Sequence, residues 1–556
     1  MRPCQGRDQS SILCSRTKRN AILYLLLACT YGEMDITTVF GTVILGSNPG
    51  RCTKKNSLMN TIDVSKIPQF VSHVTERLQN AGFEAYLVGG SVRDMLLGKT
   101  PKDWDIATNA HPEQVQYIFI DLKTIYENNF GTVTVIDMPA DSALRSFVVP
   151  EEVQITTYRS EGNYTDNRRP DSVTYETKLE KDLERRDFTM NALAYDITSG
   201  EIIDPFKGQN DIKDKIVRCV LDANNRFEED ALRMMRAIRF STSLNFAIAT
   251  ETLSALTAKS SLLQNISAER IRDELIKIIL SDNPAFGIDT LQKTGLLHFI
   301  APEFEEGIGC EQKGAHIYDV YNHLLHALQH AADKDFSLEI RLTALFHDIG
   351  KPSTRRYDKN KDKYTFFGHE VIGARMTKKI LERLKFSRET IDLVTKLVRN
   401  HMFFSDTEQI TLSAVRRIIQ KVSPQHIWLL MEVRECDRVG MKKAEAPYRL
   451  RKYHAMIEEA LRDPISVSQL AIDGKYLMET LHMKPGPRMG WILHALLEEV
   501  LENPQLNTVE QLHERVLDLD ELEDKDLKIL GEKGKDKKED ANDAEVDTLR
   551  KKHKVK

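Results

Sequence analysis

The sequence predicts an N-terminal α/β (α+β) head followed by an all-α body. Short β-type runs ("AYLVGG", "TVTVIDM" and "VQITTY") alternate with helical patterns between residues 60 and 215. Beyond residue 225, apolar residues recur at intervals of three and four, as in "EEDALRMMRAIRF", "SAERIRDELIKIIL" and "VIGARMTKKILERL". The chain of 556 residues is long enough for about three to four domains.

The composition sets few limits on function. Apolar residues make up 41% of the chain and charged residues 29%, and the formal net charge is −5. A nucleic-acid partner would therefore have to be bound by a local basic surface. The seven cysteines form no CxxC pair, which is typical of free thiols in a reducing compartment. We expect a cytoplasmic protein with no membrane partner.

The two ends of the chain differ from the rest. Near the N-terminus, Arg16, Lys18 and Arg19 precede the apolar run "AILYLLLACT", which has the layout of a signal peptide. This run is far shorter than the roughly 20 residues that span a bilayer. We interpret residues 1–58 as a disordered or non-native extension, with a targeting segment as the alternative. Residues 521–556 contain as many basic as acidic residues and few apolar ones, which predicts a disordered charged tail.

The first orderly element is an amphipathic helix expected over residues 65–81, which Gly82 ends. It is followed by the stretch "LVGGSVRDMLLGKTPKDWDIATN". In this stretch, Gly89 and Gly90 end an apolar run and open a short helix. The N–H groups at the start of such a helix suit phosphate binding.

Two carboxylates follow two residues apart, at Asp103 and Asp105. On a strand they would point to the same face, and Trp104 would face a core on the other side. A cation would stabilise two carboxylates that repel each other, and oxygen ligands with positions left for phosphate and water suit Mg²⁺. Metal ions held in this way can activate a hydroxyl and neutralise a pyrophosphate leaving group. An isolated pair of this kind is more often a solvated turn.

Together, the glycine pair, the Arg-Asp pair and the DxD closely resemble the signature of the class II tRNA nucleotidyltransferase and bacterial poly(A) polymerase family. The resemblance implies a polymerase-β-like nucleotidyltransferase head in which Asp103 and Asp105 are catalytic and bind Mg²⁺. It also implies that the triphosphate is held by a loop formed by Gly89, Gly90, Arg93 and Asp94.

Such a site usually contains a third carboxylate on a neighbouring strand. Where the family has a stretch like "VEVTTFR", this chain reads "VQITTYR", so Gln154 stands where an acid is expected. Either the site works with two acids or its metal binding is weakened. In the second case, the head could be a degenerate RNA-binding module.

The stretch "DLERRDFTMNALAYD" contains Arg185, Arg186 and Asp187 ahead of an apolar helical start. Taken alone, these charges could form a salt-bridged helix entrance. The resemblance instead implies that they grip the ribose and the triphosphate, with Asp187 favouring a 2′-hydroxyl. It also places Asn191 among the nucleotide-binding residues.

The stretch "RFEEDALRMMRAIRF" bears on the choice of base. Asp230 and Arg233 are expected at i, i+3 on one helix face. An acid accepts from an exocyclic amino group and an arginine donates to a ring acceptor, so the pair could take C and A while rejecting U and G. The alternative is a surface salt bridge. The resemblance makes this pair the amino-acid template for CTP and ATP, adds Arg236 to the nucleotide site, and favours CCA-adding enzymes over poly(A) polymerases, which tend to have a proline after the Glu-Asp pair.

Histidines collect beyond residue 315 in an order that can hold divalent transition metals. This order resembles that of HD-domain phosphohydrolases. The resemblance implies a second divalent metal, of unknown type, and an additional activity, for example on 2′,3′-cyclic or terminal phosphates. The implied ligands are His323, His347, Asp348, His369, His401 and Asp437.

The leading hypothesis is a CCA-adding tRNA nucleotidyltransferase that uses CTP, ATP and Mg²⁺ without a nucleic-acid template and releases pyrophosphate. The alternatives are a bacterial poly(A) polymerase, a partial CC- or A-adding enzyme, and a degenerate head whose HD domain alone performs chemistry. The expected domains are the extension over 1–58, the catalytic head over 59–215, a helical nucleotide-selecting neck over 216–300, an HD domain over 301–445, a helical tRNA-binding region over 446–520 and the tail over 521–556.

Overall fold

The computed structural model describes residues 62–127, 131–137, 151–162, 173–312, 316–359, 362–402, 410–442 and 447–534. The expected extension over residues 1–58 lies outside these residues. None of the helices described is long and apolar enough to cross a lipid bilayer. The described cysteines are buried free thiols, at Cys219, Cys310 and Cys436.

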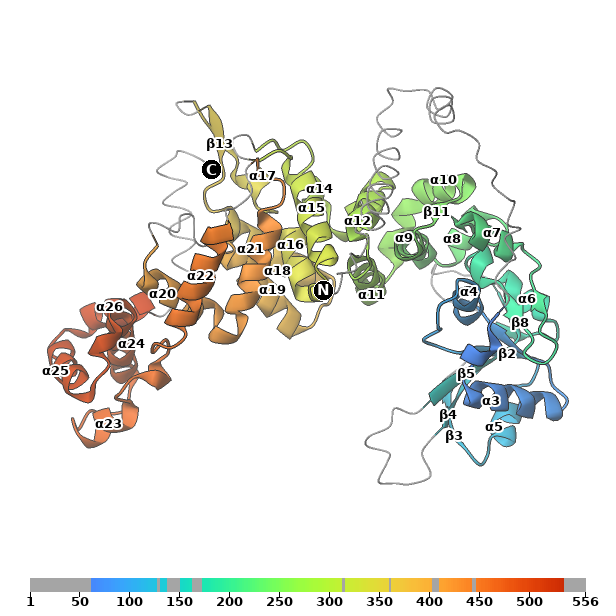
Figure 1. The fold of residues 1–556 in the computed structure, drawn as a ribbon, viewed down its shortest axis with the longest axis horizontal. Coiled ribbons are helices and arrows are strands. Elements are labelled where there is room, and N and C mark those ends of the chain that lie inside the picture. Colours follow the sequence, from blue (N-terminus) through green and yellow to red (C-terminus); the bar gives the residue numbers. More distant parts are fainter. Residues whose placement is uncertain are drawn as a thin grey trace, which may run out of the picture. The chain divides into compact units, whose positions relative to one another are not determined.

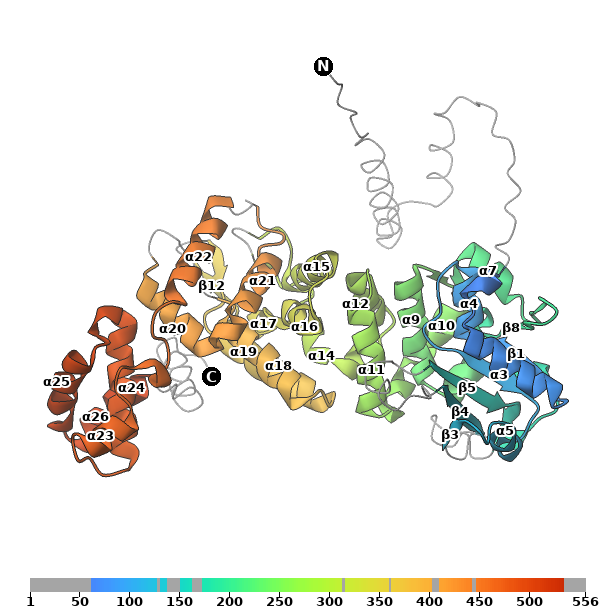
Figure 2. The ribbon, with the colours of Figure 1, turned by 60° about the horizontal axis from the view of Figure 1, so that its bottom comes forward.

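The head is built on a seven-stranded mixed sheet (Figures 1 and 2). Across the sheet the strands follow the order β3-β4-β5-β2-β1-β8-β9. β2 and β5 run parallel, and the other neighbouring pairs are antiparallel. The strands are β1 (Ala85–Val88), β2 (Asp105–Thr108), β3 (Lys123–Glu127), β4 (Thr132–Asp137), β5 (Glu151–Thr157), β8 (Ala194–Tyr195) and β9 (Ile202–Ile203). A separate hairpin joins β6 (Arg159–Glu161) to β7 (Val173–Tyr175).

Helices cover the apolar face of this sheet. In β5, Val153 and Ile155 are buried in the core, whereas the alternate residues face the other way. The head helices are α3 (Gln69–Asn80), α4 (Gly90–Leu96), α5 (Pro112–Ile118), α6 (Leu179–Glu184) and α7 (Gly208–Asp214). Of these, α3 and α5 pack against β5 on the apolar face (Figure 1). A short 3-10 helix spans Val64–Lys66, and the first α-helix begins at Gln69 rather than at residue 65, because Pro68 disfavours helical backbone in the residue before it.

The strand-helix turn at the glycine pair forms as expected. β1 ends at Val88, and Gly89 adopts a left-handed φ of +76° before α4 begins. Trp104 is buried in the core, which confirms that it faces away from the carboxylates. β2 starts only at Asp105, so Asp103 lies just before the strand.

The neck that follows is helical apart from the short parallel pair β10 (Ile216–Val217) and β11 (Ala247–Ile248). Its helices are α8 (Ala223–Glu229), α9 (Leu232–Leu244), α10 (Thr250–Lys259), α11 (Ala268–Ile279), α12 (Pro284–Lys293), α13 (Leu297–Ile300) and α14 (Pro302–Glu305). The prediction that Asp230 and Arg233 share one helix is wrong. Asp230 has extended backbone and ends α8, and its carboxylate accepts from the Leu232 N–H at 3.0 Å at the start of α9. Aspartate favours such capping positions over helix interiors.

The part of the body that carries the histidines is also helical (Figure 2). Its elements are α15 (Val320–Asp333), α16 (Leu338–Phe346), α17 (Lys351–Thr354), α18 (His369–Arg383), α19 (Arg388–Asn400), α20 (Leu412–Val422) and α21 (Ile427–Asp437), with the hairpin β12 (Arg356–Asp358) and β13 (Lys363–Thr365). Asp319 caps α15 by accepting from the Asn322 N–H at 2.8 Å. This cap fixes the helical turn that carries His323.

The C-terminal helices correct one expectation. They are α22 (Pro447–Ala460), α23 (Gly474–Glu479), α24 (Pro487–Glu502), α25 (Val509–Asp520) and α26 (Asp524–Gly534). The prediction of disorder from residue 521 is therefore wrong as far as residue 534. Leu527 is fully buried and Leu530 partly buried in the same core as α24, because an apolar stripe runs through the charged sequence. The rest of the expected tail lies outside the described residues.

Candidate functional site

The carboxylates of the DxD lie at one edge of the head sheet. Asp105 begins β2 and is half-buried, whereas Asp103 is exposed. Burial raises the pKa of Asp105, the charge of Asp103 adds to this rise, and Arg186 opposes it. A half-buried carboxylate with a second one beside it is stabilised by a cation, so the donor set fits the divalent ion expected there.

Gly89 lets the backbone approach a cationic side chain. A Cβ atom at this position would lie 2.8 Å from Nη1 of Arg186. Arg186 is thus next to the glycine turn and close enough to Asp105 to influence its ionisation. The first N–H groups of α4, the guanidinium and the two carboxylates meet at this edge, as a site for a metal–triphosphate complex requires.

A chain of side chains joins α4 to the neck. Arg93 donates from Nε to Asp94 at 2.9 Å and from Nη1 to Oδ1 of Asn191 at 2.6 Å. The amide of Asn191 donates to Asp187 at 3.0 Å, and Arg236 donates to the other oxygen of Asp187 at 2.6 and 2.9 Å. Although burial opposes ionisation, Arg236 and Asn191 lower the pKa of Asp187 to about 2. Five of the predicted nucleotide-binding residues therefore form one network, in which both Asp187 oxygens accept from protein donors.

The two arginines of the RRD motif are held by a residue that the sequence reasoning missed. The fully buried Asp182 on α6 accepts from Arg185 at 2.7 and 3.0 Å and from Arg186 at 3.1 Å. Its position three and four residues before the arginines is the spacing of helical ion pairs, which is the signal that could have identified it. Asp182 thereby orients both guanidinium groups.

The Asp230 carboxylate and the Arg233 guanidinium each contact other residues of the described chain. Asp230 accepts from Nη2 of Arg270 at 2.7 Å, whereas Arg233 donates to Glu229 at 2.5 Å and to the carbonyl oxygen of Arg185 at 3.0 Å. Arg270, in the first turn of α11, is a second residue that the sequence reasoning did not place at the site.

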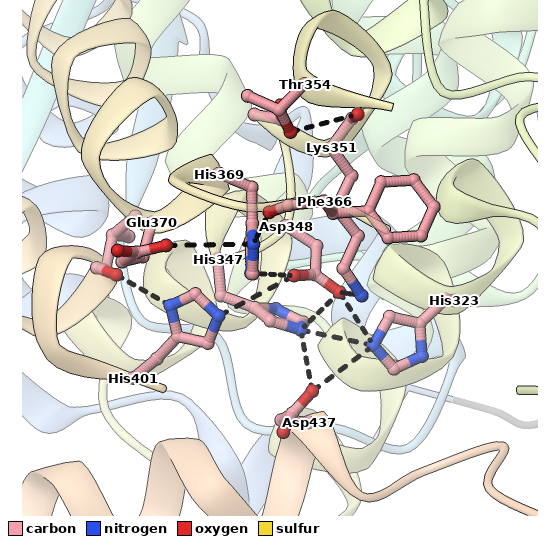
Figure 3. A network of polar contacts seen from close by, with 12 residues as sticks. His323, His347, Asp348, Lys351, Thr354, Phe366, His369, Glu370, His401 and Asp437 are labelled. Atoms are coloured by element: carbon pink, nitrogen blue, oxygen red, sulfur yellow. Dashed lines mark hydrogen bonds and ion pairs between the residues drawn. The ribbon is translucent and has the colours of Figure 1, made fainter. Parts of the chain in front are cut away.

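The six predicted HD ligands converge in one buried cluster (Figure 3). All of them lie at or near helix ends, within α15, α18 and α21 or directly after α16 and α19. Asp348 belongs to two groups of ligand atoms. The first group contains His323, His347, Asp348 and Asp437, and the second contains Asp348, His369 and His401. Within each group, the ligand atoms lie within 4.8 Å of one another.

The geometry of the histidines fits metal binding. Four of the histidines have Nδ1 at 2.6–3.1 Å from a backbone carbonyl oxygen. The pairs are His323 with Val439, His347 with Ala344, His369 with Phe366 and His401 with Val398. This contact directs every Nε2 into the cluster and fixes the tautomer that a metal needs. Within the described residues, the Nε2 atoms of His369 and His401 are buried without a hydrogen-bond partner, and they lie 3.3 and 3.6 Å from Oδ1 of Asp348. A metal ion would satisfy such atoms, so the donor set fits one or two divalent ions.

Lys351 is a further charged group of this cluster that sequence reasoning missed. Its Nζ lies 2.5 Å from Asp348 and donates to Gln312 at 2.6 Å, and its side chain is buried. Although burial opposes ionisation, Lys351 and His347 hold the pKa of Asp348 well below its usual range. The i, i+3 spacing from Asp348 to Lys351 was the available signal.

Comparison with known families agrees with this geometry. Residues 85–218 match the family described as "Poly A polymerase head domain". Residues 245–308 match "Probable RNA and SrmB- binding site of polymerase A", and residues 315–435 match "HD domain". The three matches coincide with the parts that carry the carboxylates, the neck helices and the histidine cluster. An HD domain is therefore present.

Similar proteins are CCA-adding enzymes. One from Lactobacillus helveticus is 33% identical over 83% of this chain and 100% of its own length, and one from Streptococcus uberis is 33% identical over 78% and 93%. One from Levilactobacillus brevis is 44% identical, but the match spans only 55% of its length. A crystal structure of the Bacillus stearothermophilus CCA-adding enzyme in complex with CTP superposes with a TM-score of 0.61 at 28% identity, covering 81% of this chain and 96% of that one. The chain belongs to the family of CCA-adding enzymes.

Proposed function

We propose that this protein adds C, C and A to the 3′ end of tRNA, using CTP and ATP and releasing pyrophosphate. The observation that carries the proposal is the match along the whole length of a CCA-adding enzyme. The arrangement of the head agrees with it, because the carboxylates, the glycine turn and Arg186 lie together at one sheet edge. The cytoplasm, where tRNA is processed, is the compartment we propose.

In this proposal Asp103 and Asp105 hold Mg²⁺. The bound ion would favour ionisation of the attacking hydroxyl and offset charge on the leaving pyrophosphate. The N–H groups of α4 and Arg186 would bind the triphosphate. The network through Arg93, Asn191 and Asp187 would keep Arg236 in place at the nucleotide.

We assign base selection to Asp230 and Arg233. For both to reach a base, Asp230 has to share its carboxylate with Arg270, and Arg233 has to share its guanidinium with Glu229. These protein partners hold the two side chains near the rotamers seen here. A base that offers an amino group beside an acceptor would complete the pairing, and uracil or guanine would present the reverse order.

The decisive assay uses tRNAs ending before CCA, after C and after CC, each with Mg²⁺ and one labelled nucleotide. Ordered addition of C, C and A that then stops is the expected result. Continued A addition would identify a poly(A) polymerase, and addition of only C or only A would identify a partial enzyme. Absence of any incorporation would leave the HD domain as the sole catalytic part.

We further propose that the HD domain is a divalent-metal-dependent phosphohydrolase. The buried Nε2 atoms of His369 and His401, which face Asp348 and have no hydrogen-bond partner among the described residues, support this assignment. The metal would supply Lewis acidity at a phosphate, and Lys351 would contribute a fixed positive charge beside it.

The test measures phosphate release and opening of 2′,3′-cyclic nucleotides with Mg²⁺, Mn²⁺, Ni²⁺ or Zn²⁺ added singly to metal-stripped protein. Activity that Asp348→Asn abolishes, while CCA addition persists, is the expected result. If no metal supports turnover although the cluster binds it, the metal centre has a structural role.

A further inference from the structure

Gln154 lies beside Asp105, where the expected third acid would have stood. The two residues are directly paired across the parallel strands β2 and β5. Paired residues of neighbouring strands project to the same face, so Gln154 faces the proposed metal site. Its carboxamide, however, brings no negative charge. Asp103 and Asp105 contribute two negative charges, and the nearby Arg186 offsets part of them.

The neighbour of Gln154 on the other strand, β4, is also uncharged. On β4, Thr134 pairs with Gln154 and is 5% exposed, and its hydroxyl has no hydrogen-bond partner within the described residues. A carboxamide can donate to or accept from a hydroxyl. Gln154 therefore suits a neutral polar row that ends at Asp105.

The next acidic residue on the same face is Glu152. Side chains alternate along β5, where Val153 is buried and Glu152 and Gln154 are both exposed on the opposite face. The Gln154 N–H donates to the Trp104 carbonyl oxygen at 3.0 Å. Asp103 precedes this point, before β2 begins. β5 continues beyond it, and Glu152 pairs only with Ile136 of β4. Glu152 thus lies on the metal-site face at the strand end next to Asp103.

We propose that Glu152, one pleat away from Gln154, supplies the third carboxylate for the divalent metal of the nucleotidyltransferase site. The inference rests on the proposed function, because it assigns a ligand to that site. Glutamate is one methylene longer than aspartate, which suits a ligand that starts from a neighbouring strand. With Glu152 included, the charge at the site again suits a divalent ion bound by oxygen ligands.

The chain offers a matched control for this proposal. Glu151 is adjacent, also exposed and also acidic, but it alternates to the opposite face of β5. Glu152→Gln and Glu151→Gln therefore remove the same charge one residue apart. Only the first change is expected to affect the metal site.

The test uses Fe²⁺ alone as a probe on the full-length protein, with ascorbate and peroxide generating radicals that cut the backbone near bound iron. Cuts near Asp103 and Asp105 report on the head, and cuts near His347 and Asp348 provide an internal reference in the same molecule. We expect Glu152→Gln to raise the Fe²⁺ concentration for half-maximal head cleavage about tenfold, the lower end of what lost support at a metal site costs. Cleavage at the HD site should stay unchanged.

Glu151→Gln should leave head cleavage within about twofold of the wild type, a change below 0.5 kcal/mol. The double variant Glu152→Gln/Gln154→Glu should recover head cleavage, because it moves the acid back beside Asp105. Thermal unfolding of each variant checks that the fold is retained.

Different results would overturn the Glu152 ligand and the metal site itself. If Glu152→Gln and Glu151→Gln give the same head cleavage as the wild type, the proposal for Glu152 is overturned, and the proposed nucleotidyltransferase site still stands. If the wild type shows no cleavage near Asp103 and Asp105 that Mg²⁺ suppresses, both the third ligand and the proposed metal site are overturned.

Discussion

At the residue scale, Arg270 holds the carboxylate of Asp230, the residue proposed to select the base. Its Nη2 donates to one carboxylate oxygen at 2.7 Å, while the other oxygen accepts from the Leu232 N–H. The second guanidinium nitrogen, Nη1, is buried without a partner in the described chain. If Asp230 selects the base as proposed, Arg270 is a positioning residue that acts through Asp230.

Replacing Arg270 tests this role. We expect Arg270→Met to reduce the preference for CTP over UTP about tenfold, because a good pairing to a base edge contributes about 1–3 kcal/mol of discrimination. Single-nucleotide incorporation into a tRNA that lacks CCA measures the ratio of kcat/KM values. Arg272→Met is the control, since Arg272 lies on the same helix and pairs with Asp273. Equal loss with CTP and UTP would contradict a role in base choice.

From the sequence we could identify the charged residues that follow a family pattern. We could not identify the residues whose side chains orient them by hydrogen bonds. The DxD and the HD ligands were recognisable because their order is unusual. Asp182 and Arg270 were not, because an acid or arginine on a helix is common and only the fold brings Asp182 to two arginines and Arg270 to Asp230. The prediction that Asp103 and Asp105 share one strand holds only for Asp105. The strand begins at Asp105, and Asp103 lies two residues before it.

At the element scale, the structure shows where periodicity was informative. The runs around residues 85, 132 and 151 became β1, β4 and β5. β4 and β5 are rich in β-branched residues, whereas β1 is a short apolar run. Periodicity did not reveal the break between α8 and α9. The apolar spacing continues through it, and only the capping aspartate interrupts the backbone. Composition likewise concealed α26, whose few leucines lie among many charges.

A glycine allows α26 to pack closely. A Cβ at Gly531 would lie 2.6 Å from the backbone of Trp491 on α24. We expect Gly531→Val to destabilise this packing by about 1–3 kcal/mol, the usual cost of an overpacked contact. Limited proteolysis should then cut within residues 524–534 faster than in the wild type. Lys528→Ala, on the same helix, is the control, and equal cleavage of the two variants would refute the packing role.

At the scale of the whole molecule, the head and the HD domain offer two candidate metal sites with different ligand chemistry. The head presents carboxylates at a sheet edge, whereas the HD domain presents imidazoles and carboxylates in a buried cluster. Oxygen ligands favour Mg²⁺, and imidazoles favour transition metals. The two sites should therefore respond to different chelators and different ions.

Metal removal should lower the stability of the HD domain. A metal present at about a hundred times its dissociation constant stabilises the folded state by about 2.7 kcal/mol. We expect a transition-metal chelator to lower the corresponding melting transition, and added Mn²⁺ or Zn²⁺ to restore it, in differential scanning calorimetry. Asp348→Asn should abolish the response because Asp348 belongs to both ligand groups. A response that survives this substitution would place the stabilising ion elsewhere.

The position of the HD ligands at helix ends has a consequence for how this part of the chain is held together. His323 and Asp437 come from helices far apart in the sequence, and the other ligands come from segments between them. Metal bound in the two ligand groups would therefore join these helices through the shared Asp348, as a disulfide joins distant segments in secreted domains. The described cysteines are free and buried, so the cross-link available to this region is one that a chelator can open and a metal can close.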